Sequence, residues 1–210
     1  GRPRIIIAIP GAADLVVLFS PAPGRSWGRP DFDRLGRRKG LALGESGADF
    51  LGAGGLLNGS PHGWHSDFLP KVVGIPAFPE DSAFARLLTS PLAVGGEGRA
   101  GGIVRVTVHE EPGKLAATGI YDGGRFPAEV AGLGREEGSG GHHWTIVKHG
   151  DFTLWGIDPD PATMTVAGKR LFVNLCDALL RAPAEAARFP GKVRAARGTR
   201  EGVLEAGYRH

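Results

Sequence analysis

The most constraining feature of the sequence is the glycine-rich stretch of residues 41–57, which reads LALGESGADFLGAGGLL. A short apolar run, Leu41–Leu43, stops at Gly44 and is followed by Ser46 and Gly47. A strand that turns abruptly into a helix needs small residues at the turn, because larger side chains would clash with neighbouring backbone. The stretch therefore predicts an elbow with Ser46 at the carboxyl end of a sheet, facing helix amides that stabilise an anion.

Two other interpretations of this stretch are open. Short Gly-x-Ser-Gly patterns arise often by chance, so the stretch is also compatible with a plain turn between a strand and a helix that carries no chemistry. A phosphate-binding loop is less favoured, because Gly52-Ala53-Gly54-Gly55 lacks the Lys-Ser/Thr that follows in that motif.

The composition indicates a globular chain rich in turns and free of disulfides. Glycine supplies 35 of 210 residues, more than twice the average share of about 7%. Cys176 is the only cysteine, which excludes an internal disulfide. No apolar run approaches the ~20 residues of a membrane span and no signal peptide is visible, so we expect a cytoplasmic location. The chain begins at Gly1, and we expect a processed protein or an excerpt of a longer one, whose other domains would be its partners.

The charge of the chain is only mildly basic, with a formal net charge of +3. Most of the excess lies near the carboxyl terminus, so we expect one domain over residues 1–182 and a basic tail over residues 183–210. A solvated terminus explains such a tail, and the sequence therefore does not favour a nucleic-acid partner. The sequence is compatible with a small-molecule ligand.

Apolar runs predict the sheet. Ile5–Ile9, Leu15–Phe19 and Leu41–Leu43 are continuously apolar, which is typical of strands in a parallel α/β sheet covered on both faces. The alternating pattern that begins at Ile103, and a hairpin within Trp144–Ile157, predict antiparallel strands at one side.

Further segments connect or cover these strands. Residues 58–67, with His62 and His65, read as a polar loop, and Ser82–Leu88 reads as a short helix. The last helix should be capped by Thr163 or Thr165 and end at Pro183, with Cys176 on its apolar face.

Three segments, in this order, resemble the class I glutamine amidotransferase superfamily. Residues 14–24 resemble its strand that ends in a Gly- and Pro-rich loop and carries an oxyanion amide. Gly44–Ala48 resembles its nucleophile elbow, where most members have Gly-x-Cys-x-Gly. The family's closing block is a strand that leads into His-Pro-Glu and then a helix. Residues 155–160 resemble it, followed by Thr165, Gly168, Leu171, Phe172 and Asn174.

The resemblance covers roughly residues 5–180 and implies a flavodoxin-like fold. In that fold a mostly parallel sheet carries helices on both faces, here with antiparallel strands added at one side. It further implies that the following residues line the ligand site: Ser20, Gly24, Gly44, Glu45 and Gly47. We expect no cofactor and no bound metal.

Three departures from the family pattern concern its chemistry. Ser46 stands at the position of the nucleophilic Cys, Asp158 at that of the His, and Asp160 at that of the Glu. A serine hydroxyl is far less acidic than a thiol and needs a positioned base. A carboxylate is a much weaker base than imidazole. The resemblance therefore implies a domain without glutaminase activity, retained as a ligand-binding or accessory module.

A serine hydrolase is the alternative. Serine peptidases similar to dipeptidase E and cyanophycinase, in the same superfamily, place a Ser in a Gly-x-Ser-x-Gly elbow, and Ser46 would then be the nucleophile. Its base would have to be a histidine from elsewhere, and the candidates are His62, His65, His109, His142 and His143. A zinc site built from His62, His65 and Asp67 with His142 or His143 is a weaker alternative, because His-x-x-His spacing is common and no thiolate takes part.

Overall fold

The computed structural model describes only part of the chain, and within 61–70 and 111–118 it describes the backbone alone. The described residues are 15–18, 38–44, 47, 48, 51, 61–99, 101–118, 130–136, 144–157, 160 and 162–183. The strands and the helix among them are β1 Leu15–Leu18, β2 Lys39–Leu43, β3 Pro61–Ile75, β4 Glu97–Arg99, β5 Ile103–Thr118, β6 Val130–Glu136, β7 Trp144–His149, β8 Phe152–Trp155 and α3 Val166–Arg181.

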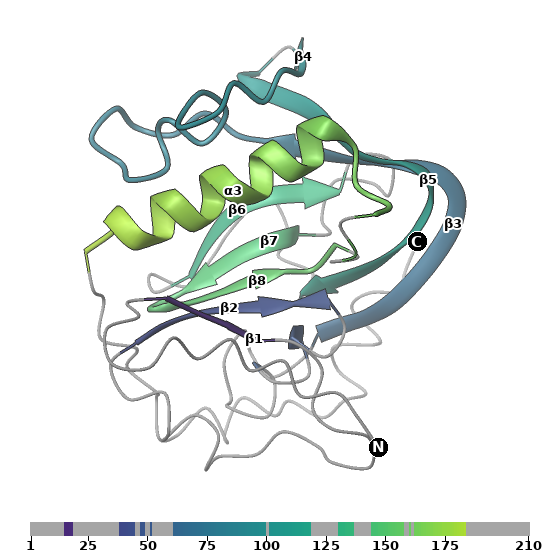
Figure 1. Cartoon of the computed structure of the whole chain (residues 1–210), viewed down its shortest axis with the longest axis horizontal. Helices are drawn as coiled ribbons and strands as arrows, with labels where there is room; N and C mark the ends of the chain where they lie inside the picture. Colours follow the sequence, from purple (N-terminus) through teal and green to yellow (C-terminus); the bar gives the residue numbers. More distant parts are fainter. Residues whose placement is uncertain are drawn as a thin grey trace.

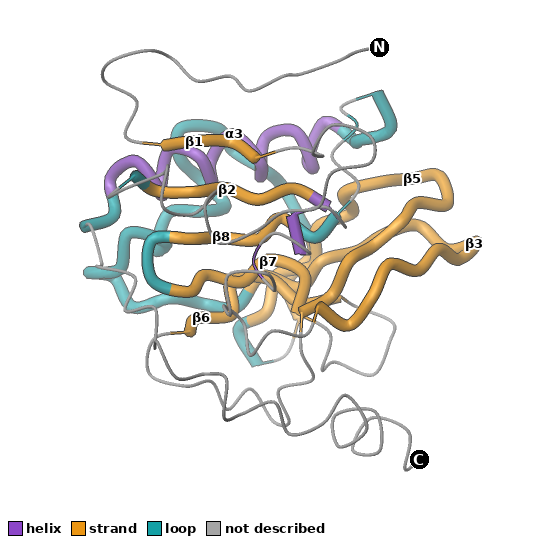
Figure 2. Tube along the Cα trace, turned by 90° about the horizontal axis from the view of Figure 1, so that it is seen from below, coloured by secondary structure: helices purple, strands orange, loops and turns teal. Residues whose placement is uncertain are grey.

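The eight strands form one mixed sheet in the order β1-β2-β8-β7-β6-β3-β5-β4. Only the pairings of β1 with β2 and of β2 with β8 are parallel, and the other pairings are antiparallel. α3 lies across one face of this sheet (Figure 1). Seen from below, β1, β2, β8, β7 and β6 lie side by side in this order (Figure 2).

The prediction of a flavodoxin-like, mostly parallel sheet with helices on both faces is therefore wrong. Strands dominate the described residues, and α3 is the one long helix among them. Leu15–Leu18 and Leu41–Leu43 are parallel as predicted, but every pairing from β8 to β4 is antiparallel. Burial on both faces does not require a parallel sheet, because β7 and β8 are buried at every position and pair antiparallel to each other.

Individual strand predictions fare better. Leu15–Leu18 and Leu41–Leu43 lie in parallel strands, and the hairpin of β7 and β8 is confirmed, with Gly150 at its turn in a left-handed conformation (φ +57°). Ile5–Ile9 lies outside the described residues.

A long antiparallel ribbon of β3 and β5 replaces the polar loop predicted over residues 58–67. β3 begins at Pro61, so the backbone of His62 and His65 belongs to a strand. The register of the ribbon shifts at several points, which marks bulges, and the ribbon curves away from the flat part of the sheet (Figure 1). Its far end returns to the sheet, because Thr118 pairs with Trp144 at the start of β7.

The core lies between the sheet and α3. Leu41 and Trp155 project to this side from β2 and β8, and Leu171 and Leu175 project from α3; all four are fully buried. The rings of Trp155 and Phe172 meet edge to face, with centroids 5.1 Å apart and planes at 86°. Such aromatic pairs stabilise a core beyond their area burial.

Thr165 sets the start of α3, as one of the two predicted caps. Its hydroxyl accepts a hydrogen bond from the Gly168 amide at 2.8 Å and donates one to the Thr107 carbonyl at 2.7 Å. The cap therefore fixes the start of the helix and also ties it to β5. Cys176 is half-buried against the core, as its place on the apolar face predicted.

The helix predicted over Ser82–Leu88 is absent, and this segment is a series of turns. Its hydrogen bonds run from Ala85 to Ser82 and from Leu87 to Phe84, so they span three residues and not four. Phe84 and Leu87 are buried in the core. Burial of these two side chains over successive turns prevails over helix propensity.

Asn174 on α3 holds this segment in place. Its side-chain amide donates to the carbonyls of Leu87 and Leu92, at 2.8 and 2.7 Å, and its Oδ1 accepts from the Leu92 amide at 3.0 Å. Asn174 is fully buried, so truncation leaves backbone groups without partners.

We expect Asn174→Ala to lower the free energy of unfolding by about 1–3 kcal/mol, the cost of leaving buried backbone groups unsatisfied. Hydrogen exchange should show faster exchange at Leu92 before the β7 and β8 amides change. Equal protection at Leu92 in both proteins would contradict this role of Asn174.

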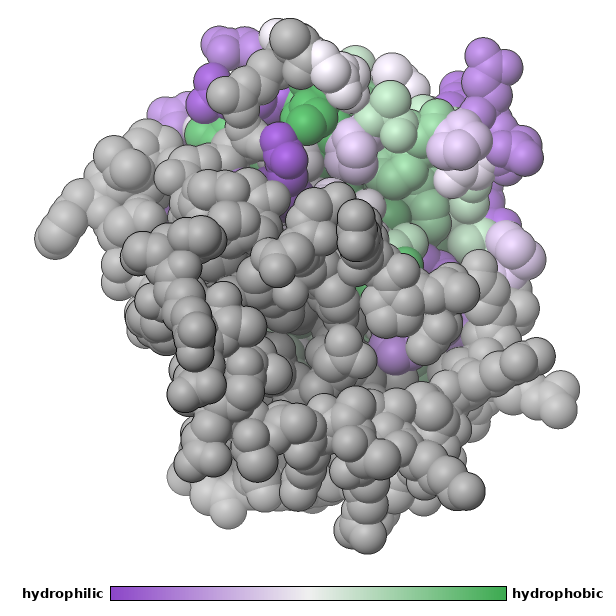
Figure 3. All heavy atoms as spheres, turned by 180° about the vertical axis from the view of Figure 1, so that it is seen from behind, coloured by the Kyte–Doolittle hydropathy of each residue, from purple (hydrophilic) through white to green (hydrophobic). Residues whose placement is uncertain are grey.

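No helix among the described residues is both long and apolar enough to cross a bilayer. Seen from the side opposite Figure 1, the described residues expose an apolar area bordered by hydrophilic side chains (Figure 3).

Candidate ligand site at the carboxyl edge of the parallel strands

The parallel strands define the edge at which the motif segments leave the sheet. Leu43 ends β2 and pairs in register with Trp155, which ends β8. Ser46 follows Leu43 by three positions in the sequence, and Asp158 follows Trp155 by three. Both motif segments leave the sheet at the carboxyl ends of neighbouring parallel strands, which makes this edge the candidate site.

The described part of the elbow has the tight geometry that its glycines predict. Gly44 takes φ +59°, a left-handed conformation that favours glycine. Gly47 lies so close to β2 that a Cβ there would be 2.5 Å from the Ala42 carbonyl carbon. Gly47 and Ala48 are helical. The strand therefore turns directly into a helical segment packed on Ala42.

Several predicted site residues fall outside the described part of the chain. These are Ser20, Gly24, Glu45, Ser46, Asp158, His142 and His143. Their proximity to one another stays a prediction, and the structure describes only the strands that lead toward them.

Asp160, at the position of the family's Glu, has a local role. Its carboxylate accepts a hydrogen bond from the Ala162 amide at 2.9 Å, and its carbonyl accepts one from the Thr163 hydroxyl at 2.9 Å. The residue is exposed. Asp160 therefore shapes the turn that leads into α3, as Asp side chains do in many turns.

The histidines divide into two groups. His109 is fully buried, and its Nδ1 donates to the Thr163 carbonyl at 2.7 Å, so this ring fastens the turn before α3 to β5. Its position relative to Ser46 stays a prediction, because Ser46 lies outside the described residues. His62 and His65 lie near the start of β3, where the β3 backbone pairs with the end of β5. This end of β5 also pairs with Trp144 of β7.

Sequence analysis missed a buried ion pair at the same end of the sheet. Lys71 on β3 and Glu136 on β6 are 2% and 4% exposed, and their charged groups lie 3.4 Å apart. β6 and β8 run in the same direction, because both are antiparallel to β7, so Glu136 lies at the edge where Trp155 ends β8. His109 is the cross-strand partner of Lys71. The sequence offers one signal for this ion pair: Lys71 is the first residue of the otherwise apolar run Lys71–Ile75.

Trp155 ends β8 with its side chain in the core, where its ring meets Phe172 of α3. Its indole Nε1 is buried and has no hydrogen-bond partner within the described residues. A buried donor without an acceptor costs free energy, and in native structures it often marks a position for water or a ligand.

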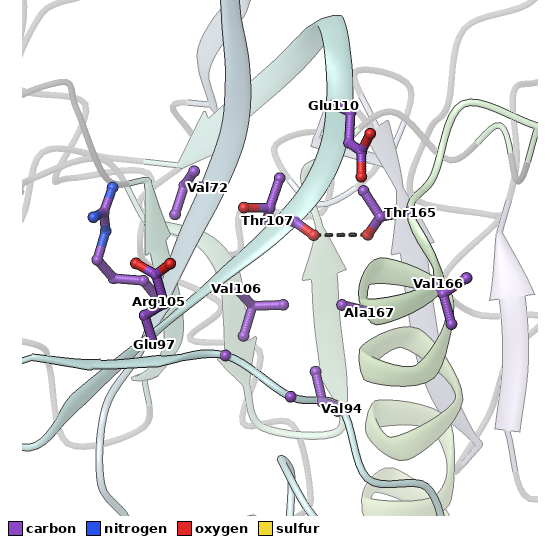
Figure 4. Close-up of a pocket in the computed structure, with 12 residues that line it drawn as sticks. Val72, Val94, Glu97, Arg105, Val106, Thr107, Glu110, Thr165, Val166 and Ala167 are labelled. Atoms are coloured by element: carbon purple, nitrogen blue, oxygen red, sulfur yellow. Dashed lines mark hydrogen bonds between the residues drawn. The ribbon is translucent and has the colours of Figure 1, made fainter.

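A groove of about 510 Å³ lies elsewhere, between β5, the start of α3 and the segment before β4 (Figure 4). Val94, Val106 and Ala167 form its apolar part, whereas the Arg105 side chain points away from α3. No serine, cysteine or histidine lines it. Of its two threonines, Thr107 and Thr165, the latter uses its hydroxyl to cap α3.

The closing block, the most specific part of the family resemblance, consists of residues that fix α3 on the sheet. Thr165 caps the helix, and Gly168 lies against the Val108 backbone, where an added Cβ would be 2.6 Å from the carbonyl oxygen. Leu171 is in the core, and Asn174 holds residues 87–92. The helical part of the closing block therefore anchors α3, whereas Asp158, in its first part, lies outside the described residues.

Neither a metal centre nor a reactive thiol is found among the described residues. They contain no group of three or more His, Cys, Asp and Glu side chains arranged to hold an ion. Burial raises the pKa of the Cys176 thiol to about 11, so the thiol is protonated and unreactive at neutral pH. The side chains of the His62, His65 and Asp67 set lie outside this description.

Comparison with known proteins adds no relative: no family model, curated protein or solved structure matches the chain. The site is therefore argued from its own residues.

Proposed function

We propose that the chain is a non-catalytic, glutamine amidotransferase-like module that binds a small ligand at the carboxyl edge of β2 and β8. The observation that carries this proposal is the register of Leu43 with Trp155, because it brings the strands that precede Ser46 and Asp158 side by side. The resemblance rests on the order of these motifs and not on a flavodoxin-like architecture.

The chemistry of the replaced residues supports binding over catalysis. Glutaminase chemistry of this family needs a thiolate and an imidazole, and here a serine and an aspartate stand in those positions. Asp160 is engaged in its own turn. The amides of the helical segment at Gly47 and Ala48 are hydrogen-bond donors suited to an anionic or carbonyl ligand.

We expect the purified protein to release no ammonia from L-glutamine above the level of the Ser46→Ala variant. The reason is that a serine hydroxyl without an imidazole base is not a nucleophile at neutral pH. Ser46→Ala should also change the free energy of unfolding by less than about 0.5 kcal/mol. Ammonia release that the wild type shows and Ser46→Ala lacks would overturn the proposal.

A serine hydrolase is a second candidate, which the position of the β3 backbone favours. The backbone of the segment with His62 and His65 pairs with the last residues of β5. Thr118, at the end of β5, pairs in turn with Trp144 at the start of β7, close to the edge where β8 ends. A fluorophosphonate probe separates the two functions. A covalent adduct on Ser46 that is lost in His62→Ala or His65→Ala would establish the hydrolase, and an unmodified intact mass supports the binding module.

A further inference from the structure

The outward face of α3 carries a line of apolar residues. Val166, Val173 and Leu180 are 64%, 44% and 50% exposed, and they are spaced by seven residues. At 3.6 residues per turn, a spacing of seven places all three side chains within about 40° of one line along the helix. The opposite face of α3 holds the core residues Leu171 and Leu175. The helix is thus apolar on its covered side and along the centre of its exposed side.

This pattern differs from that of a helix whose outer face meets only water. Such a helix carries charged or polar residues along its outermost line. A line of apolar residues every seven positions is instead the seam by which one helix packs on another at a shallow crossing angle. Leu92, 40% exposed and held against Asn174, extends the apolar surface beside the helix.

We propose that this face is a two-fold interface between two copies of the chain, in which α3 packs antiparallel against α3 of the second copy. A two-fold interface is self-complementary, so each residue faces the position that mirrors it about the axis. Val173 is the midpoint of the line, so it meets its own equivalent. Val166 of one copy then meets Leu180 of the other.

The charges beside the line support this occupant and this direction. Arg170 and Asp177 lie three residues before and four residues after Val173, on the same side of the line. In the antiparallel arrangement, Arg170 of each copy therefore faces Asp177 of the other. Asp177 already pairs with Arg181 on its own helix, at a surface where both side chains are exposed. A parallel arrangement would instead place Arg170 beside Lys169 of the other copy, which brings like charges together.

Single cysteines test the arrangement, in a Cys176→Ala background that removes the native thiol. Packed helices lie about 8–10 Å apart, and each Cα lies ~2.3 Å from its axis, which leaves roughly 3.5–5.5 Å between facing Cα atoms. Disulfides span Cα separations of about 4.4–6.8 Å. Val173→Cys should therefore cross-link two copies under mild oxidation.

Val166→Cys is the matched control, because it is equally a valine on the same line. Two copies of residue 166 would be about 21 Å apart, the length of fourteen helical residues. We expect no disulfide between copies of the Val166→Cys variant, whereas Val166→Cys combined with Leu180→Cys should cross-link. Cross-linking of Val166→Cys as efficient as that of Val173→Cys, or no cross-linking of any variant, would overturn the proposal.

Sedimentation of the full chain tests the charge pairing independently of thiols. Arg170→Asp and Asp177→Arg should each weaken the dimer several-fold, and the double exchange should restore it. Val173→Lys, which places two ammonium groups on the axis, should yield monomers. Ala77→Lys adds the same charge at an exposed position off α3 and should leave the dimer unchanged. A wild-type chain that sediments as a monomer at all concentrations would contradict the interface.

Discussion

We expect Glu136→Leu to lower the free energy of unfolding by about 3–5 kcal/mol, the usual effect of removing one partner of a buried ion pair. Lys71 and Glu136 are 2% and 4% exposed, so water replaces little of the lost interaction. Their charged groups lie 3.4 Å apart, between β3 and β6. Urea denaturation followed by circular dichroism measures the change.

The double variant Lys71→Met/Glu136→Leu is the matched control. It removes both charges and fills a similar volume, and such replacements are often neutral or stabilising. We therefore expect it to recover most of the stability that Glu136→Leu loses. A double variant as unstable as the single one would show that the ion pair does not account for the effect.

Gly168→Ala is expected to destabilise the protein by about 1–3 kcal/mol, the typical cost of overpacking. The direction is opposite to helix propensity, which favours alanine over glycine by ~1 kcal/mol inside a helix. An alanine Cβ would lie 2.6 Å from the Val108 carbonyl oxygen and 3.0 Å from the Val108 Cα. Backbone atoms of β5 cannot rotate aside, so α3 must move away from the sheet.

Gly98→Ala supplies the comparison for this substitution. Gly98 lies in β4, and a Cβ there would have no atom within 4 Å. We expect a change in unfolding free energy within about 0.5 kcal/mol. Equal effects of the two substitutions, or a more stable Gly168→Ala, would contradict the close packing of α3 on β5.

The sequence predicted local features wherever neighbouring residues determine them. The glycines around Ser46 predicted the tight turn that Gly44 and Gly47 make, and Thr165 was one of two predicted caps. The hairpin of β7 and β8 followed from two apolar runs around His149–Asp151. In each case the interacting residues lie within a few positions of one another.

Features that depend on distant pairing were not predictable in this way. The share of parallel pairing was overestimated, because the long ribbon of β3 and β5 is antiparallel and its pairing depends on residues far apart in the sequence. The polar segment around His62 and His65 forms part of β3 because β5, some 50 residues later, pairs with it. The contact between Lys71 and Glu136 likewise joins residues 65 positions apart.

The central claim is that the segments after β2 and β8 share one site, and a thiol-bridging reagent tests it directly. Ser46→Cys/Asp158→Cys, in a Cys176→Ala background, should be bridged within one chain by dibromobimane, which becomes fluorescent only when it joins two close thiols. Ser46→Cys/Thr89→Cys is the control pair. Bridging of the 46–158 pair alone is the predicted result. No bridging of that pair, in a protein with an unchanged circular dichroism spectrum, would contradict the shared site.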